Sequence, residues 1–316
     1  LFEIAENNNV LLLYEAAVAG GIPIIKTIKN SIFLNNILKI SGILNGTTNY
    51  ILSKMESENL SFDDALEDAK SKGYAELDPT NDIEGLDAAY KLTILSTICF
   101  GSVINFKNNE INGIKNIQID DIINAKKLGY RIKLISEASI INNEISCITE
   151  PKLIKMNNPL ASVNGVLNAV QIQTDQLENL FIEGEGAGGK ATASSVISDL
   201  YEIFFNSKIS SLGYKISNLK YLKKHDILEI EKSYYVRIMT KDIAGVLATI
   251  TLHFNESNIS IEKILQVPEN IGVNLPIPII IVTHKIKKKL LIQTITKIEN
   301  LDFVLDKIII INIDKN

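Results

Sequence analysis

The chain has 316 residues, of which 46% are hydrophobic and 22% are charged, and its formal net charge is −5 at pH 7. This length suffices for one large domain or for two to three ordinary ones, and the composition excludes general disorder. The acidic balance argues against nucleic acid as a partner, because phosphates attract basic surfaces. No apolar run approaches the roughly 20 residues that a membrane-spanning helix needs, so we expect no membrane partner.

The two cysteines, Cys99 and Cys147, lie among apolar neighbours, which indicates buried thiols and no disulfide framework. The start of the chain lacks the basic stretch and apolar core of a secretory signal, so we expect a cytoplasmic protein. Leu1 opens directly on a helical pattern. We therefore expect the chain to begin inside a longer protein.

The first 25 residues combine a helical pattern at 1–8, an apolar run at 10–15 and a glycine-rich break at 19–23. The apolar run predicts a buried strand. A helix, a strand and a glycine turn are typical of the last unit of an open α/β domain. No G-x-G-x-x-G motif follows a strand in this stretch.

Residues 26–205 predict a long mixed region of helices and strands. Helices are predicted at 27–36, 48–58, 61–72, 85–98 and 192–205. Strands are predicted at 38–44, in a hairpin at 132–148 around Asn142-Asn143, and in a pair at 166–173 and 180–183. Together they predict an α+β fold with a mixed, largely antiparallel sheet and helices on one face.

Residues 206–232 are richer in Lys and Ser and less periodic, and are predicted to be a linker. The tail at 233–316 then predicts strand, helix, strand, strand, helix, strand, with its two middle strands at 259–267 and 276–284. This β-α-β-β-α-β order is the ferredoxin-like arrangement.

The richest polar segment runs from Gly73 to Asp82 and continues at 85–91. Asp87 and Lys91 are four residues apart on a predicted helix, so they share one face. If the preceding loop folds back, Glu76 and Asp82 bring more carboxylates to that lysine. Carboxylates can hold an ammonium group and a lysine can move a proton. The alternative is an exposed ion pair beside capping acids, which spacing alone favours.

Three other segments could bind ligands, and each has a simpler explanation. At 42–50 a strand ends in Asn-Gly and two threonines open a helix, which can hold an anion or merely cap the helix. At 183–189 a glycine loop precedes a helix, so backbone could approach a ligand, but glycine loops are common. At 15–23 one acid and a run of turn carbonyls could bind a monovalent cation or only shape a turn.

In the tail, the segment Lys241 to Ile250 places Gly245 between a strand and a helix, and Asn258 follows that helix. Free N–H groups at the helix start could hold a small amino acid against a second copy of the chain. An ordinary βα turn is the alternative.

Taken in order, the segments 15–23, 42–50, 73–91 and 183–192 resemble the catalytic region of homoserine dehydrogenase, over residues 1–205. The tail at 234–312 resembles an ACT domain, an amino-acid-sensing module, although Ala244 stands where a proline is often found. The resemblance identifies residues 1–25 as a remnant of an NAD(P)-binding Rossmann domain. It identifies residues 26–205 as the substrate-binding, catalytic and dimerisation domain, and 233–316 as an ACT-like regulatory domain.

The resemblance also implies roles for single residues. Lys91 is implied to be the catalytic, proton-transferring lysine. The implied substrate-binding residues are Glu76, Asp82, Asp87, Gly73, Tyr74, Thr47, Thr48 and Asn49. The implied cofactor-binding residues are Gly186, Ala187 and Gly188, and the implied sodium site is Glu15 with Val18, Gly20 and Ile22. The expected effector-binding residues are Asp242, Gly245, Val246 and Asn258.

The implied activity is the interconversion of L-homoserine and L-aspartate 4-semialdehyde with NAD(P), in threonine, methionine and isoleucine biosynthesis. A homodimer or larger homo-oligomer is expected, with threonine as an effector. We expect the chain by itself to bind NAD(P) weakly and not to turn over. The first alternative is an amino-acid-sensing binding protein with an inert catalytic remnant. The second is another NAD-linked oxidoreductase, against which the set of Glu76, Asp87 and Lys91 argues.

Overall fold

The computed structural model describes residues 1–205, 211–266 and 276–315. Contacts divide the chain into two compact units. The first unit holds residues 1–124, 132–151 and 156–225, and the second holds 125–131, 152–155 and 226–316. Residues 1–25 are therefore part of the first unit and do not form a body of their own.

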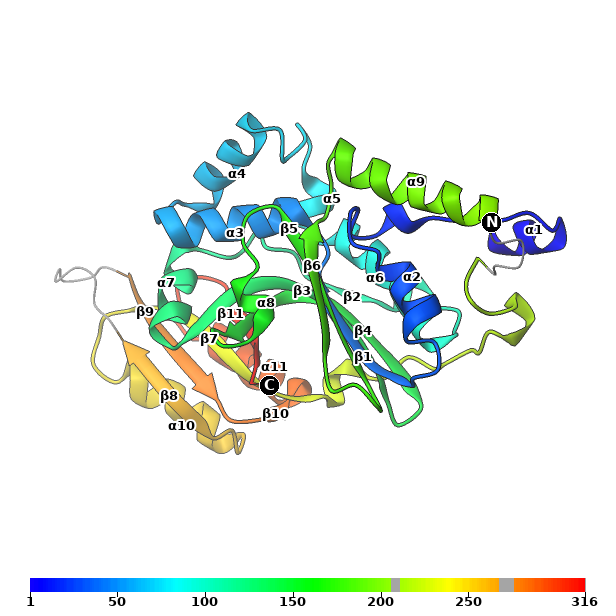
Figure 1. Cartoon of the computed structure of the whole chain (residues 1–316). Coiled ribbons are helices and arrows are strands. Elements are labelled where there is room, and N and C mark those ends of the chain that lie inside the picture. The colour runs from blue at the N-terminus through cyan, green and yellow to red at the C-terminus, as the bar shows by residue number, and fades with distance from the viewer. Residues whose placement is uncertain (206–210, 267–275, 316) are drawn as a thin grey trace. The chain divides into compact units, whose positions relative to one another are not determined.

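The first unit is built on a sheet with the strand order β6-β5-β1-β3-β4. Its strands are β1 (Ile37–Ile43), β3 (Tyr130–Ile141), β4 (Glu144–Lys155), β5 (Leu167–Thr174) and β6 (Leu180–Glu185). β1 pairs antiparallel with both β3 and β5, and the short β2 (Glu110–Ile111) pairs parallel with β4. The predicted mixed, largely antiparallel sheet is confirmed (Figure 1).

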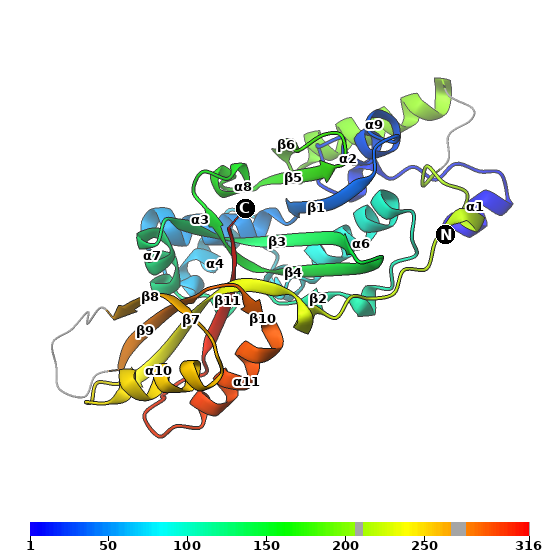
Figure 2. The same cartoon turned by 90° about the horizontal axis from the view of Figure 1, so that it is seen from below.

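The helices of this region follow the order of the predictions, with additions. They are α1 (Phe2–Asn7), α2 (Ile24–Lys26), α3 (Gly46–Glu58), α4 (Phe62–Ser71), α5 (Thr80–Ile83), α6 (Leu86–Phe100), α7 (Ile119–Lys127), α8 (Pro159–Ser162) and α9 (Gly189–Phe205). The sequence had not predicted α5, α7 and α8. α3 packs against β5 and α6 against β1, and both helices lie on the same side of the strands in Figure 2.

Local signals account for several boundaries. Ser61 caps α4, because its side chain accepts a hydrogen bond from the Asp64 backbone N–H at 3.2 Å. The β3–β4 hairpin turns at Asn142 and Asn143, whose φ angles are 51° and 63°. Two positive φ angles are what a type I′ turn needs, and Asn tolerates them better than most residues. The predicted hairpin is confirmed.

The predicted strand at 10–15 is wrong. The segment has no ladder partner among the described residues and runs into a 3₁₀ turn at Glu15–Ala17. Side chains take the place of a partner strand: the backbone N–H of Leu12 donates to Ser211 Oγ at 3.1 Å, and that of Glu15 to Asp199 Oδ2 at 2.9 Å. The helix predicted at 27–36 is shorter, since α2 continues only through a π turn at Thr27–Ser31.

The second unit contains β7 (Glu231–Lys241), α10 (Val246–Glu256), β8 (Ile261–Gln266), β9 (Pro276–Thr283), β10 (Ile286–Lys287), α11 (Lys288–Glu299) and β11 (Ile309–Asp314). The main strands lie in the order β11-β7-β9-β8, and neighbours in this order are antiparallel. Both helices pack on a buried apolar core that includes Val236, Ile250, Phe254 and Leu291. The predicted order of the six main elements is confirmed.

Between the two regions, residues 211–230 form single 3₁₀ turns at Ile216–Asn218 and Ile227–Glu229. Residues up to 225 belong to the first unit, so the linker at 206–232 stays a prediction. Residues 206–210 lie outside the described residues, as does residue 267 of the predicted middle strand. Cys99 and Cys147 are buried free thiols, as expected. Across the described residues, every helix is too short or too polar to cross a membrane.

Candidate active site

Three carboxylate and amide side chains meet where β1 ends and α3 begins. Asn45 is the N-cap of α3, and its Nδ2 donates to Asp82 Oδ1 at 2.7 Å and to Asp87 Oδ2 at 2.8 Å. Asp82 comes from α5 and Asp87 from the first turn of α6. Three separate helix starts therefore contribute one polar cluster.

Lys91 completes this cluster. It lies one turn after Asp87 on α6, and its Nζ donates to Asp87 Oδ2 at 2.7 Å and to the Leu44 carbonyl at 3.2 Å. The lysine and aspartate side chains are 22% and 32% exposed, so the pair is only partly open to solvent. The expected i,i+4 pair is present, and it is tied to β1 and to Asn45. The alternative of an isolated surface pair does not describe it.

The electrostatics of the cluster centre on Asp82. Burial raises the pKa of Asp82, and the nearby charge of Asp87 raises it further. The hydrogen bonds from Asn45 and Thr47 and the charge of Lys91 act in the opposite direction. The cluster holds two carboxylates against one ammonium, which suits a ligand that carries a positive group.

Thr47 and the loop at 73–74 lie beside this cluster. Thr47 Oγ1 donates to the Tyr74 carbonyl at 2.6 Å, and the Tyr74 ring lies 4.8 Å from the ring of Tyr50. Gly73 has a φ of +73° with open space where a Cβ would be, so the backbone angle accounts for the glycine. Thr47 also hydrogen-bonds to Asp82, so Thr47 connects the loop at Tyr74 to the cluster.

Three other predicted substrate residues form no hydrogen bond or ion pair with Asp82, Asp87 or Lys91 in the part of the chain that the structure describes. Glu76 is exposed. Thr48 and Asn49 are 0% and 1% exposed. Both side chains are therefore enclosed by the protein.

The physical reason is hydrogen bonding in the interior. Thr48 bonds back to Asn45. Asn49 Nδ2 donates to the carbonyls of Gly165 and Leu167, and its Oδ1 accepts from the buried Lys133 at 3.1 Å. Asn49 thus holds the loop before β5.

Sequence reasoning missed Asn45. The sequence predicts the end of a strand at Asn45 and a helix only from 48, although an Asn at the start of α3, which begins at Gly46, is a strong N-cap signal. That signal places the Asn45 side-chain oxygen on the helix. It does not reveal what the amide group faces, which depends on α5 and α6.

The two glycine segments predicted as separate motifs contact each other. The Gly21 N–H donates to the Glu185 carbonyl at 2.9 Å, and a Cβ on Gly186 would come within 2.1 Å of the Asn168 side chain. Gly186 is therefore half-buried against the Asn168 side chain. Ala187 and Gly188 are exposed just before α9, where they could border a cofactor such as NAD(P).

Hydrogen bonds within the protein engage most of the groups expected to bind sodium. The two carboxylate oxygens of Glu15 accept the backbone N–H groups of Ile25 at 2.8 Å and Lys26 at 2.9 Å. The Gly20 carbonyl accepts the Ser195 hydroxyl, and the Ile22 carbonyl accepts the Ile24 N–H. Among the described residues no group of three His, Cys, Asp or Glu side chains could hold a metal ion. Glu15 serves as a remote cap for α2.

In the second unit, the residues expected to bind an effector are divided between the two ends of α10. Gly245 is its N-cap with a φ of 91°, Val246 is buried, and Asp242 is exposed just before them. Asn258 follows the other end, and an 11-residue helix is about 16 Å long. A small ligand therefore cannot touch both ends within one chain.

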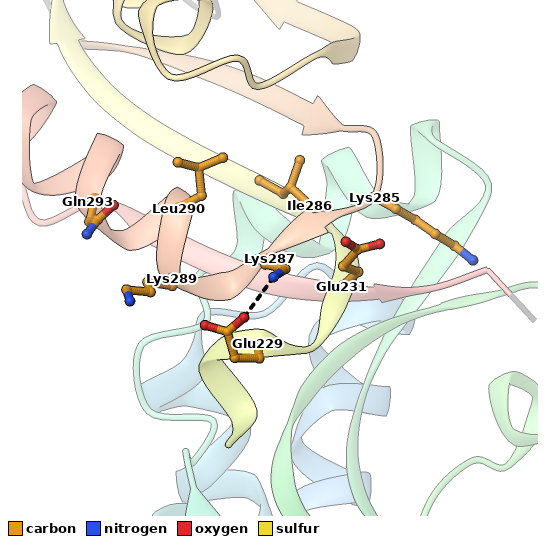
Figure 3. A pocket seen from close by; sticks show the side chains of 8 residues that line it. All are labelled: Glu229, Glu231, Lys285, Ile286, Lys287, Lys289, Leu290 and Gln293. Atoms are coloured by element: carbon orange, nitrogen blue, oxygen red, sulfur yellow. Dashed lines mark hydrogen bonds and ion pairs between the residues drawn. The ribbon is translucent and has the colours of Figure 1, made fainter. Parts of the chain in front are cut away.

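A hollow of about 460 Å³ also lies on the second unit, beside the start of α11 (Figure 3). Its lining includes Lys289 and an ion pair in which Lys287 Nζ lies 2.8 Å from Glu229 Oε2. Neither the predicted substrate residues nor the predicted effector residues line it.

Comparison with known proteins connects this geometry to a family. Residues 23–201, which contain Asn45, Asp82, Asp87 and Lys91, match the family described as homoserine dehydrogenase. The homoserine dehydrogenase of Neisseria gonorrhoeae is 38% identical over 310 residues, which cover 96% of this chain and 71% of that protein. The chain belongs to the homoserine dehydrogenase family. The enzyme of Pseudomonas aeruginosa is 38% identical across 100% of this chain and 74% of that protein.

Solved structures support the same assignment. The crystal structure of a homoserine dehydrogenase from Thiobacillus denitrificans has a TM-score of 0.91 and 38% identity, over 99% of this chain and 72% of that one. A hyperthermophilic archaeal homoserine dehydrogenase mutant in complex with NADPH has a TM-score of 0.55 and 33% identity, over 69% and 60%. As a homoserine dehydrogenase homologue the chain is an oxidoreductase of amino-acid biosynthesis.

Proposed function

We propose that the cluster of Asp82, Asp87 and Lys91 is the substrate site for the interconversion of L-homoserine and L-aspartate 4-semialdehyde. The observation that carries this proposal is the joining of both carboxylates through Asn45, within 2.8 Å, beside a lysine held at 2.7 Å. Homoserine has an ammonium group, which the two carboxylates can bind, and a C4 hydroxyl, whose proton a lysine can accept.

In the oxidation direction the C4–H bond breaks as a hydride leaves and the C4–O bond becomes a carbonyl. NAD(P), when bound, supplies the hydride acceptor. Lys91 Nζ accepts the hydroxyl proton as a neutral amine and becomes the ammonium, while its own N–H groups donate to Asp87 and to the Leu44 carbonyl. In the reduction direction the Lys91 ammonium returns that proton to the aldehyde oxygen. Ala187, Gly188 and Thr47 are the residues that we propose to border the cofactor.

Steady-state kinetics of the full-length enzyme with Lys91→Met test this assignment. We expect kcat to fall by about 10²-fold or more, because general acid–base groups contribute this much. Lys70→Met is the matched control, since Lys70 also pairs along its helix, with Glu67 at 2.8 Å, but away from the cluster. Lys70→Met should change kcat less than twofold. A Lys91→Met enzyme with normal turnover would refute the proposal.

For the second unit we propose an ACT-like amino-acid-binding role. The β-α-β-β-α-β order with strand order β11-β7-β9-β8 supports a ferredoxin-like module. Since Gly245 and Asn258 mark opposite ends of α10, we propose that an effector such as threonine binds between two copies of the chain. Calorimetric titration with threonine, with sedimentation to measure the oligomeric state, tests this. Saturable binding to a monomer, or no binding at any concentration, contradicts it.

A further inference from the structure

The orientation of the Asn45 amide follows from its contacts. Asn45 is 5% exposed, and one side-chain atom faces the backbone N–H of Thr48 at 2.8 Å. A backbone N–H can only donate, so that atom must be the oxygen. The Thr48 hydroxyl, 3.0 Å from the same atom, is compatible with this because it can donate to that oxygen. The amide nitrogen therefore has to face the two aspartates.

Both amide hydrogens are then used, one for each aspartate. The Asp82 contact is 2.7 Å and the Asp87 contact is 2.8 Å. Asn45 and Lys91 both bind Oδ2 of Asp87, which leaves Oδ1 of Asp87 outside these two contacts. A neutral double donor between two acids lowers their mutual repulsion without adding a charge that would compete with a ligand ammonium.

From this geometry we infer that Asn45 is the positioning residue of the substrate site: it holds Asp82 and Asp87 together as one receptor for the substrate ammonium. The inference rests on the proposed function of the cluster. Lys91 is part of the same arrangement, because it donates to Leu44, the residue directly before Asn45. One segment at the end of β1 thus sets the position of both acids and of the lysine.

Asn45 also caps α3, and the two roles can be separated by substitution. Ser and Asp are N-cap residues as good as Asn, since each has a side-chain oxygen for the Thr48 N–H. Asn45→Ser keeps the cap but removes both donated hydrogen bonds. Asn45→Asp keeps the cap and the shape but places a third carboxylate against Asp82 and Asp87. Ser61→Ala removes the cap of the neighbouring α4 and serves as a control for capping alone.

The experiment is steady-state kinetics against pH for these variants of the full-length enzyme. For Asn45→Ser we expect kcat/KM for homoserine to fall about 10- to 100-fold, mainly through KM, because misplaced binding groups have effects of this size. For Asn45→Asp we expect a larger fall in kcat/KM. Ser61→Ala should leave kcat/KM within twofold even if its melting temperature falls.

The pH profile gives a readout that a purely structural role would not change. The charged groups that act on Asp82 are Asp87 and Lys91, and the Asn45 hydrogen bond lowers the pKa of Asp82. Losing that bond should move the acidic limb of kcat/KM to higher pH in Asn45→Ser, and further in Asn45→Asp.

The outcomes separate this inference from the proposed function. If Asn45→Ser and Asn45→Asp leave KM and the acidic limb unchanged while Lys91→Met abolishes turnover, Asn45 is only a helix cap and the inference fails. If Lys91→Met is also active, the proposed function itself fails. If Asn45→Ser does not fold, Asn45→Asp, which matches the shape of Asn better, decides by KM and by the acidic limb of kcat/KM. If both variants misfold while Ser61→Ala folds, the inference is overturned.

Discussion

A Cβ added to Gly20 would lie 2.4 Å from the carbonyl oxygen of Gly186, although the two glycines belong to segments far apart in the sequence. Gly20 also has a φ of +41°, which side chains rarely adopt. The loop that precedes α9 is thereby fixed against the turn that precedes α2. This contact connects the folding of residues 15–23 to the loop that we propose to border the cofactor.

Gly20→Ala should therefore destabilise the first unit. Overpacking against backbone that cannot move costs about 1–3 kcal/mol, and the positive φ adds to it. Gly189→Ala is the control, because a Cβ there meets nothing within 4 Å and lies in the first turn of α9. Urea unfolding of both variants checks the prediction. Equal urea midpoints for Gly20→Ala and Gly189→Ala would show that the loop before α9 shifts to accommodate the Cβ without loss of stability.

Asp82→Asn should stabilise the folded chain at neutral pH. The folded-state pKa of Asp82 is raised by burial, so the folded state takes up a proton more readily than the unfolded state. The contribution of Asp82 to stability is then complete below the ordinary Asp pKa, about 3.9, and is lost as the pH rises through the raised value. Asn keeps an oxygen to accept from Asn45.

Measuring the unfolding free energy of the wild type and of Asp82→Asn from pH 3 to 8 tests whether the substitution stabilises the protein at neutral pH. The advantage of Asp82→Asn should be greatest at neutral pH and should shrink as the pH falls. A variant that is less stable than the wild type at pH 7 would contradict the burial argument. Its activity should fall regardless, since the substituted group is one of the proposed ammonium ligands.

Glu15→Ala should be among the costlier substitutions outside the cluster. It removes the acceptor for the N–H groups of Ile25 and Lys26 at a site that is 2% exposed. Each buried donor left unpaired costs about 1–3 kcal/mol, so we expect a loss of about 2–4 kcal/mol in unfolding free energy. Glu15→Gln retains one acceptor and should lose about half as much.

Urea unfolding in NaCl and in KCl checks both the size and the ion dependence. Because amides occupy the Glu15 oxygens, the wild type should be equally stable in the two salts. A stabilisation specific to sodium would instead support the cation site expected from the resemblance. A Glu15→Ala variant as stable as wild type would refute the capping role.

The turn at Asn142 and Asn143 offers a test of the fold alone. Both residues have positive φ, which glycine adopts without strain. Asn143→Gly should raise the unfolding free energy by up to about 0.5 kcal/mol, whereas Asn143→Ala should lower it by about 1 kcal/mol. Thermal unfolding of Asn143→Gly and Asn143→Ala, each compared with the wild type, checks this prediction. If alanine is as well tolerated as glycine, strain at this position is not important for the hairpin.

Most regular elements followed from local patterns. The periodicity at 48–58, 61–72 and 85–98 predicts α3, α4 and α6, and the Asn-Asn pair predicts the β3–β4 hairpin. The spacing of Asp87 and Lys91 alone places them on one helix face, where the structure has them in contact. Such signals are local because helix period, capping and turn conformation depend on residues only a few positions apart.

The tertiary structure decided which polar groups meet. The apolar run at 10–15 resembles a strand, but strand formation needs a partner, and side chains of Asp199 and Ser211 bond it instead. From the spacing in 73–91, Glu76 and Asp82 are equally good candidates for the site. In the structure α5 positions Asp82 to accept from Asn45, whereas Glu76 is exposed to solvent. These hydrogen bonds join residues far apart in the sequence, so they depend on how the helices and strands pack. Local sequence patterns do not contain that information.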